Sequence, residues 1–191
     1  TVTPSENPVC DGESVTFTAS AFNKGISPVY QWVVNGVSVG INDSVYTYTP
    51  ASGDHVSCIL TSSEQCTFNN PATSDSITMI VNPLLPVGIT ITPSANPICG
   101  GIPVTFTGAA INGGSTPVYQ WQVNGINAGM NNAEFTYILT EGDFVTCILT
   151  SSETCTSGNP ASSNTVNMTV IDAPEVTFTP CFDTITTLNA K

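Results

Sequence analysis

The sequence is poor in charged residues and almost lacks positive charge. Only 8% of its 191 residues are charged, and 14 acidic side chains face two lysines and no arginine, which gives a formal net charge of −12. Nucleic acids and anionic membrane surfaces are bound through basic patches. The composition therefore argues against both of these partners.

Long apolar runs are also missing. No segment approaches the ~20 apolar residues that a membrane-spanning helix needs, so no membrane insertion is expected. The sequence contains no recognisable signal peptide, as in a mature chain or an excerpt of one. Export therefore has to be argued from other features.

The residues of common catalytic and zinc sites are scarce. The chain has one histidine, His55, and no two cysteines separated by two residues. Neither a Ser-His-Asp or Cys-His catalytic set nor a zinc site is therefore expected. Glu64 and Glu153 recur in the sequence, but neither has a repeated acidic partner nearby. We expect a protein that is not an enzyme and has no cofactor.

What the chain does contain is an internal repeat with an offset of 89 residues. The segment 29–36, Val-Tyr-Gln-Trp-Val-Val-Asn-Gly, returns at 118–125 as Val-Tyr-Gln-Trp-Gln-Val-Asn-Gly. This repeat predicts two modules, a linker and the start of something further. The expected boundaries are module 1 over 1–82, a linker over 83–88, module 2 over 89–171, and a tail over 172–191 that reads as the opening strand of another module.

Each module predicts about seven short strands. The segment 14–19, Ser-Val-Thr-Phe-Thr-Ala, alternates polar and apolar residues, which indicates a half-buried strand. An Asn-Gly pair follows each tryptophan strand and favours a tight hairpin turn. No segment shows helical periodicity. The predicted fold class is all-β, with two tandem immunoglobulin-like antiparallel β-sandwiches joined by a short Pro-rich linker.

The two tryptophans and the linker leucines are assigned to packed positions. Trp32 and Trp121 are expected in the cores of the two sandwiches rather than as platforms for sugar stacking. The linker has two prolines in six residues, which makes it semi-rigid. We expect the modules to stack end to end, with Leu84 and Leu85 partly buried between them.

The order of the strands is similar to the immunoglobulin pattern, with two departures. The tryptophan strand is followed by Asp54-x-Val56-x-Cys58, as in immunoglobulin domains. However, Phe17 stands where the cysteine of the second strand would be, and Val56 replaces the corner tyrosine. The resemblance therefore implies the sandwich and leaves the usual inter-sheet disulfide without its partner.

Three longer motifs stand twice in residues 1–171, and their combination is more specific. They are Asn-Pro-x-Cys-x-Gly-x-x-Val-Thr-Phe-Thr, Tyr-Gln-Trp-x-Val-Asn-Gly and Asp-x-Val-x-Cys. With them, the module resembles the immunoglobulin-like or PKD-like repeats of very large surface proteins of Bacteroidota. That resemblance implies export by the type IX secretion system. It also implies a stalk role in adhesins, including those of gliding motility.

The seven cysteines favour an oxidising compartment, but their pairing has two solutions. If the chain turns back near Ser62, residues 58 and 66 fall opposite each other, which favours Cys58–Cys66 and Cys147–Cys155. End-to-end stacking favours instead a Cys10–Cys155 bridge, with Cys58 and Cys147 as buried thiols. The sequence identifies no partner for Cys181.

The surface offers candidate sites for glycosylation and for calcium. Asp-Ser/Thr-apolar triplets match the O-glycosylation motif of Bacteroidota and make Ser44, Ser76 and Thr184 candidate glycosylation sites. Acidic side chains are the usual ligands of calcium, yet only Asp54 recurs, as Asp143, and the linker has no acid. A solvated acidic face is preferred to a calcium site. The acidic candidates in the first module are Asp11, Glu13, Asp43, Asp54 and Asp75.

The sequence thus predicts a structural spacer or stalk segment of a long extracellular surface adhesin or filament protein. Its expected partners are neighbouring modules of the same chain, other copies in a filament, or surface glycans. The alternative is a glycan- or protein-binding module that acts through the loops 62–74 and 151–163. A binder should carry exposed aromatic residues in one module's loops, and only Phe68 qualifies, which is Ser157 in the second copy.

Overall fold

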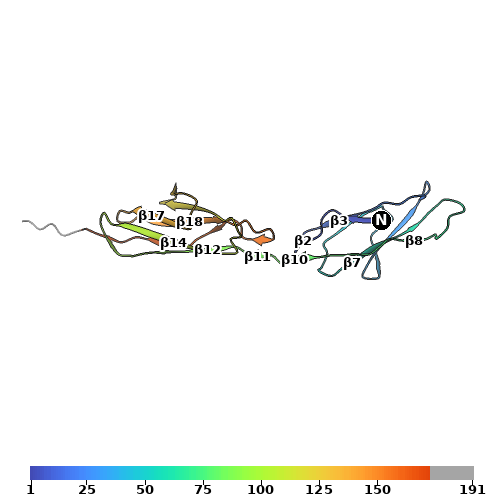
Figure 1. Cartoon of the computed structure of the whole chain (residues 1–191), viewed down its shortest axis with the longest axis horizontal. Coiled ribbons are helices and arrows are strands. Elements are labelled where there is room, and N and C mark those ends of the chain that lie inside the picture. Colours follow the sequence, from blue (N-terminus) through green and yellow to red (C-terminus); the bar gives the residue numbers. More distant parts are fainter. Residues whose placement is uncertain (173–191) are drawn as a thin grey trace, which may run out of the picture. The chain divides into compact units, whose positions relative to one another are not determined.

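The computed structural model describes residues 1–172, and every regular element in this range is a β-strand (Figure 1). The all-β prediction is confirmed. No helix in the described range is long and apolar enough to cross a membrane. The chain groups into two compact units, described separately below. The first comprises residues 1–88, 110–118 and 149–161, and the second comprises the rest from residue 89 onward.

Two sheets form the sandwich of the first unit. One is antiparallel, with the order β1 (Val2–Pro4), β3 (Val15–Ala19), β6 (Val45–Tyr48). The other has the order β5 (Val37–Val39), β4 (Val29–Val34), β7 (His55–Thr61), β8 (Ala72–Thr73), and β9 (Ile77–Thr78) also pairs with β7. The Asn-Gly hairpin joins β4 to β5, as predicted.

The core of the first unit is built around Trp32, as predicted. The Trp32 side chain is fully buried, and its ring centroid lies 6.3 Å from that of Phe17 on the facing sheet. Its indole N–H donates to the carbonyl oxygen of Asp43 at 2.9 Å, so the buried polar group is satisfied. Trp32 stands opposite Cys58 in the register of β4 and β7. The period-2 alternation buries Val15 and Phe17 on one face of β3.

The second unit repeats this architecture. One sheet has the order β12 (Gly88–Pro93), β14 (Pro103–Ile111), β17 (Glu134–Ile138). The other has the order β16 (Ile126–Ala128), β15 (Val118–Val123), β18 (Phe144–Thr150), β20 (Ala161–Ser162), and β21 (Val166–Asn167) also pairs with β18. Trp121 is fully buried, lies 6.3 Å from Phe106 and donates to the carbonyl oxygen of Asn132 at 2.8 Å. The predicted core position of Trp121 is confirmed.

The segment 77–82, which ends the first repeat, divides between two partners. Its first part is β9, whereas β10 (Val81–Asn82) pairs in parallel with β2 (Val9–Cys10). The Asn7 side chain bridges the change, because it donates to the carbonyl oxygen of Thr78 at 3.0 Å and accepts from the N–H of Ile80 at 2.9 Å. The repeated Asn-Pro pair was the sequence signal for this corner.

Candidate functional site: an inter-repeat disulfide

One disulfide, Cys10–Cys155, is present in the described range, with a Cα–Cα distance of 5.3 Å. It joins the first sequence repeat to the second across 145 residues, and both cysteines lie in the first compact unit. We call this bond and the β11–β19 pairing beside it the inter-repeat bridge. The bridge was the alternative that sequence reasoning left open.

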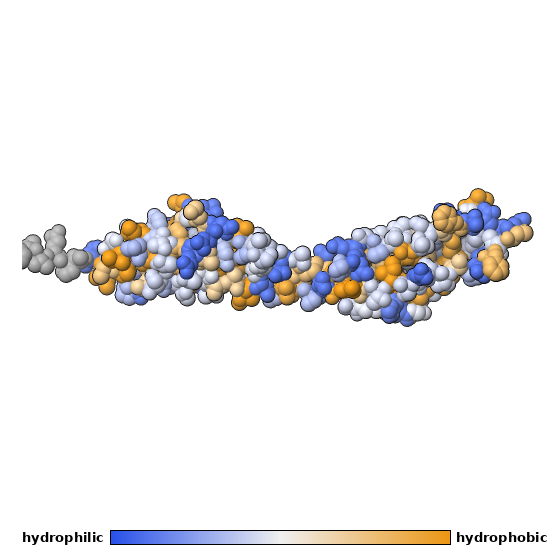
Figure 2. All heavy atoms as spheres, in the orientation of Figure 1, coloured by the Kyte–Doolittle hydropathy of each residue, from blue (hydrophilic) through white to orange (hydrophobic). Residues whose placement is uncertain are grey.

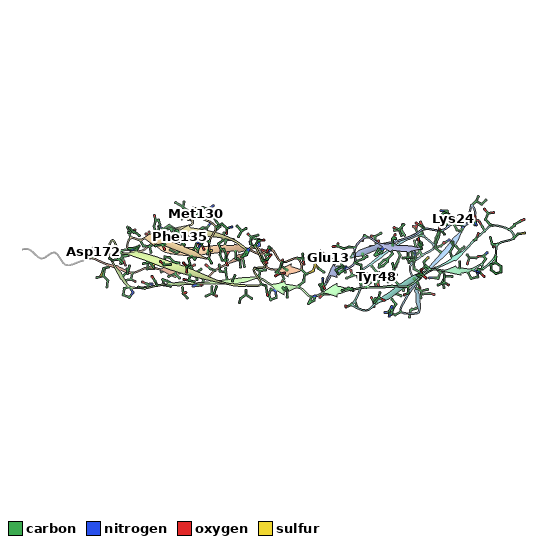
Figure 3. The ribbon with its side chains drawn as sticks, in the orientation of Figure 1. Glu13, Lys24, Tyr48, Met130, Phe135 and Asp172 are labelled. Carbon is green, nitrogen blue, oxygen red and sulfur yellow. A yellow bond between two sulfur atoms is a disulfide. The ribbon has the colours of Figure 1, made fainter. Side chains whose placement is uncertain are left out.

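The turn end of the first repeat holds Cys10 in place. Glu13, labelled in Figure 3, marks this end, and Lys24 marks the opposite end of the same repeat. Asn82 pairs with Cys10 in the parallel β10–β2 register, and the N–H of Asp11 donates to the carbonyl oxygen of Asn82 at 2.9 Å. The carbonyl oxygen of Cys10 accepts from the N–H of Glu13 at 3.1 Å. Cys10 is therefore fixed on both sides by the backbone.

The linker holds the other cysteine. β11 (Leu85–Pro86) pairs in parallel with β19 (Thr156–Ser157), and the N–H of Leu85 donates to the carbonyl oxygen of Cys155 at 2.8 Å. The side chain of Asn112 donates to the carbonyl oxygen of Pro86 at 2.7 Å. These contacts leave Cys155 only 7% exposed.

The expected burial of the linker leucines is wrong. Leu84 is 43% exposed and Leu85 is 36% exposed. Backbone hydrogen bonds, rather than leucine side chains, attach the linker to the second repeat's loop. A two-residue pairing that contains proline has no alternating pattern, so sequence reasoning did not find it.

The preferred pairing of Cys58 with Cys66, and of Cys147 with Cys155, is also wrong. The chain does not fold back symmetrically at Ser62, so the residue opposite Cys58 is Ser74. Its N–H donates to the carbonyl oxygen of Cys58 at 2.9 Å, and its hydroxyl accepts from the N–H of Cys58 at 3.0 Å. Ser163 stands opposite Cys147 in the same way. Cys66 instead lies exposed in its loop.

The two core cysteines are buried thiols. Burial raises the pKa of the Cys58 thiol, and it raises the pKa of the Cys147 thiol to about 11. The thiolate is the reactive form of cysteine, so neither residue is a nucleophile near neutral pH.

The recurring acid, Asp54, accepts hydrogen bonds that hold the turn at residues 51–54 in place. Its carboxylate accepts from the N–H of Ala51 at 2.9 Å, from the Asn35 amide at 2.8 Å and from the Tyr48 hydroxyl at 3.2 Å. The hydrogen bond from Ala51 is the main cause that lowers the pKa of Asp54. Burial, followed by the charge of Asp54, raises the pKa of Tyr48. No group of three or more acidic, histidine or cysteine residues suited to a metal occurs among residues 1–172.

The equivalent acid in the second repeat, Asp143, has a similar set of donors. It accepts from the N–H of Thr140 at 2.8 Å, the main cause that lowers its pKa, and from the Asn124 amide at 2.7 Å. The two acids therefore share a local structural role. The remaining acidic candidates of the first module, Asp11, Glu13, Asp43 and Asp75, do not recur.

The candidate glycosylation residues lie on separate edges. Ser44 is half-buried just before β6, where its hydroxyl is 3.5 Å from the Asp43 carboxylate. Ser76 is exposed just before β9. Thr184 and Cys181 lie outside the described residues. Ser76 is therefore more accessible to solvent than Ser44.

The loops 62–74 and 151–163 are folded by the same internal hydrogen bonds. In the first, the N–H of Ser62 donates to the Asn70 side chain at 2.9 Å, and the Ser62 hydroxyl donates to the carbonyl oxygen of Asn23 at 2.6 Å. Ser151 makes both contacts in the second loop, with Asn159 and Asn112. Sequence reasoning missed these residues, although the repeated Ser-Ser-Glu and Asn-Pro pairs were their signal.

No family model matches the chain, and no curated protein matches it. Among solved structures, the ectodomain of mouse nectin-like molecule 4 (Ig1–Ig3) is 15% identical, with a TM-score of 0.38, over 93% of this chain and 66% of that chain. The fibronectin(III)-like modules of Clostridium thermocellum CbhA are 12% identical, with a TM-score of 0.38, over 90% and 94%. A chain of the mouse coronavirus receptor-binding domain complexed with its murine receptor is 10% identical, with a TM-score of 0.43, over 90% and 99%.

These matches go no further than the kind of fold. The first is described by its Ig domains and the second by its fibronectin(III)-like modules, and at these identities and TM-scores the matches carry no argument about function. The description of this chain as tandem immunoglobulin-like sandwiches rests on its own strand order and core.

Proposed function

We propose that the two repeats form a structural spacer segment of a long extracellular surface protein. The observation that carries this proposal is the inter-repeat bridge, which ties Cys10 of the first repeat to Cys155 of the second. A disulfide of this kind persists in oxidising surroundings such as the cell exterior. A stalk has to transmit force without lengthening, and a covalent tie between consecutive modules serves that need.

The distribution of repeated features also supports a spacer. The core tryptophans, the turn-bracing acids and the loop serines recur with the same contacts in both repeats. These residues maintain the fold of each module. Some exposed side chains differ between the repeats, such as Phe22 and Phe68, which are Ile111 and Ser157 in the second, as expected where the modules do not share a common ligand.

A second candidate function rests on the loop 62–74. Phe22 and Phe68 are 95% and 92% exposed, and both line a cavity of about 500 Å³ that also includes Cys66. Figure 2 shows apolar side chains at the surface at this end of the first repeat. The second repeat has Ile111 and Ser157 at the equivalent positions. The sequence alone predicts this role for Phe68 and not for Phe22.

A binding screen of the full chain separates the two functions. The chain would be tested on a glycan array and on intact cells, beside Phe22→Ile and Phe68→Ser, which place the second repeat's residues in the first. A spacer shows no specific binding with any of the three proteins. Binding by the parent chain that both variants lose would overturn the spacer in favour of the loop as a recognition site.

A further inference from the structure

The hairpin turn that follows each tryptophan strand carries an Asn-Gly pair, the dipeptide most prone to deamidation. In this reaction the backbone nitrogen of the glycine attacks the side-chain carbonyl carbon of the asparagine, and glycine has no side chain to hinder the approach. Asn35-Gly36 and Asn124-Gly125 are both exposed, so water and base reach each turn. Sequence and exposure alone therefore favour deamidation at both positions.

Both polar atoms of the Asn35 side chain are held by hydrogen bonds. The amide nitrogen donates to the Asp54 carboxylate at 2.8 Å, and the side-chain oxygen accepts from the N–H of His55 at 2.9 Å. The backbone N–H of Asn35 also donates to the carbonyl oxygen of His55 at 2.9 Å. The Asn35 amide is therefore attached at both ends to the residues where β7 begins.

The second repeat holds Asn124 in the same way. Its amide nitrogen donates to the Asp143 carboxylate at 2.7 Å, and its side-chain oxygen accepts from the N–H of Phe144 at 3.0 Å. The backbone N–H of Asn124 donates to the carbonyl oxygen of Phe144 at 2.9 Å. We call the three hydrogen bonds of the turn asparagine in each repeat the amide clamp.

The acceptor of the amide nitrogen in each clamp is an ionised carboxylate. The hydrogen bonds from the N–H of Ala51 and from the Asn35 amide, in that order, lower the pKa of Asp54. The pKa of Asp143 is lowered for the equivalent reasons. A hydrogen bond to a charged acceptor is roughly twice as strong as one between neutral groups. The amide nitrogen is the leaving group in deamidation, so this strong bond has to break before the reaction is complete.

A third Asn-Gly pair, Asn112-Gly113, has different surroundings. Within residues 1–172, the Asn112 side chain makes one hydrogen bond, from its amide nitrogen to the carbonyl oxygen of Pro86 at 2.7 Å. Gly113 is buried, unlike the glycines of the two hairpin turns. No carboxylate holds this amide, so Asn112 is a reference site in the same chain whose deamidation should not depend on either clamp.

We propose that Asn35 and Asn124 are deamidation sites that the amide clamps protect in the folded chain. While a clamp is intact, the asparagine amide is held at both ends and is not attacked by the glycine nitrogen. Once a turn has reacted, the clamp does not re-form, because a carboxylate at position 35 would face Asp54 where the amide donates now, and like charges at this distance repel. Deamidation thus detaches the turn from β7 irreversibly. The proposal does not depend on the spacer function.

The reaction needs only water and base. A solvent base removes the proton from the backbone nitrogen of Gly36, and this nitrogen bonds to the side-chain carbonyl carbon of Asn35. The bond from that carbon to the amide nitrogen breaks, and the amide nitrogen takes up a proton and leaves as ammonia, which gives a succinimide ring. Water then adds to either ring carbonyl, the bond from that carbon to the ring nitrogen breaks, and the nitrogen regains a proton. The product is aspartate or isoaspartate at position 35.

The test compares the full chain with Asp54→Ser and with Asp143→Ser. Each variant removes the carboxylate of one clamp and keeps the other clamp as its matched control. Val15→Ala controls for lost stability, because Val15 is fully buried on β3, in the sheet that faces the clamp, and its truncation weakens the same core without removing a clamp contact.

All four proteins are incubated at mildly alkaline pH, and melting curves check that each is folded at the incubation temperature. The parent chain is also incubated in denaturant, so one comparison needs no variant. Peptide mapping by mass, with isoaspartate and aspartate peptides separated, gives the rate of deamidation at each Asn-Gly pair.

The clamps predict a reciprocal pattern. In the folded parent chain, both turn asparagines should deamidate at least tenfold more slowly than in denaturant. Asp54→Ser should raise the rate at Asn35 about tenfold, the effect of one hydrogen bond to a charged group, and leave Asn124 unchanged. Asp143→Ser should do the reverse. The rate at Asn112 should be the same in the parent chain and in both variants.

Three results would overturn the proposal. The first is an equal rate at the turn asparagines in the folded and the denatured parent chain. The second is a rate at Asn35 that Asp54→Ser leaves unchanged or lowers, since the carboxylate would then not protect the amide. The third is an equal acceleration by Val15→Ala, which would trace the protection to the stability of the module rather than to the clamp.

Discussion

The loop ends of the two repeats have the same internal hydrogen bonds and different surroundings. Cys155 is 7% exposed and bonded, whereas Cys66 is exposed and unpaired. Leu149 is fully buried, whereas its equivalent, Leu60, is only partly buried. The internal hydrogen bonds of the loop are therefore encoded locally, and the linker adds backbone hydrogen bonds to the second repeat's loop.

The backbone shows a related difference. β19 exists where β11 supplies its hydrogen-bond partners, and the equivalent segment of the first repeat, 67–68, forms no strand. Cys66 has a φ of +61°, in the left-handed region that residues other than glycine rarely adopt. Cys155 is not among the described residues with a positive φ. The two loops, whose sequences differ at four positions, thus have different backbone conformations at the equivalent cysteine.

The largest expected effect comes from breaking the bridge under force. With Cys10–Cys155 intact, pulling on the two ends of the chain cannot extend the 145-residue segment that the bond closes. Cys10→Ser should therefore add on the order of 500 Å to the contour length released on unfolding, at ~3.3–3.6 Å per residue. Single-molecule stretching of the full chain measures this length.

Cys66→Ser is the matched control for the force experiment. It removes the equivalent cysteine of the other loop, which is unpaired, and should leave the released length unchanged. An equal released contour length for the parent chain and for Cys10→Ser would show that the disulfide does not close this segment. Cys155 would then differ from Cys66 in burial but not in bonding.

The next effect tests whether the two cores are equivalent. Trp32 and Trp121 are both fully buried, with the same ring neighbours and the same indole hydrogen bond. Trp→Ala at either position should lower the free energy of unfolding by about 3–5 kcal/mol. Denaturant titration measures the loss. Val37→Ala, at a position 64% exposed, is the control and should change stability by less than about 0.5 kcal/mol. A tryptophan variant as stable as the Val37→Ala control would show that this tryptophan does not stabilise its core, and the two cores would then not be equivalent.

The cores were predictable from sequence because their signals are local. The alternation in β3 and the tryptophan strand followed by Asn-Gly fix which side chains face inward within a few residues. The bridge partner was not fixed in this way. Spacing favours a near neighbour and therefore predicts Cys66 as the partner of Cys58, but the β7–β8 pairing and two hydrogen bonds place Ser74 there instead. The choice between Cys66 and Cys155 for Cys10 depends on the linker path, for which the sequence of β11 has no periodic signal.

A smaller effect concerns the four unpaired cysteines in the described range. Cys66 and Cys99 are exposed, and Cys58 and Cys147 are buried. At pH 8, a thiol with a pKa of about 11 is ionised in about one molecule in a thousand, so Cys147 should resist alkylation. Native protein treated with iodoacetamide should carry the label at Cys66 and Cys99, and unfolded protein at all four, as read by peptide mass. Rapid labelling of Cys147 in native protein would contradict its place in the core.

The smallest expected effect is the acid sensitivity of the two turns. In the folded chain, backbone and amide donors hold the pKa of Asp54 and of Asp143 below the ordinary value of about 3.9. A carboxylate with a lowered folded pKa stabilises the fold above the unfolded pKa, and this contribution is lost as the pH falls through the folded pKa. Stability should therefore decline as the pH drops below about 4.

Asn substitutions show whether the two turns contribute alike. Asp54→Asn and Asp143→Asn each remove one titrating group, so each should flatten the decline of the melting temperature between neutral and acid pH by a similar amount. Asp75→Asn, an exposed acid that does not recur, is the control and should leave the decline as it is. A decline that neither turn variant changes would mean that the lowered pKa values do not contribute to stability. A change from Asp54→Asn alone would trace the acid sensitivity to what differs around the two acids: Asp54 accepts from the Tyr48 hydroxyl and lies beside His55, whereas Asp143 accepts from the Thr140 hydroxyl.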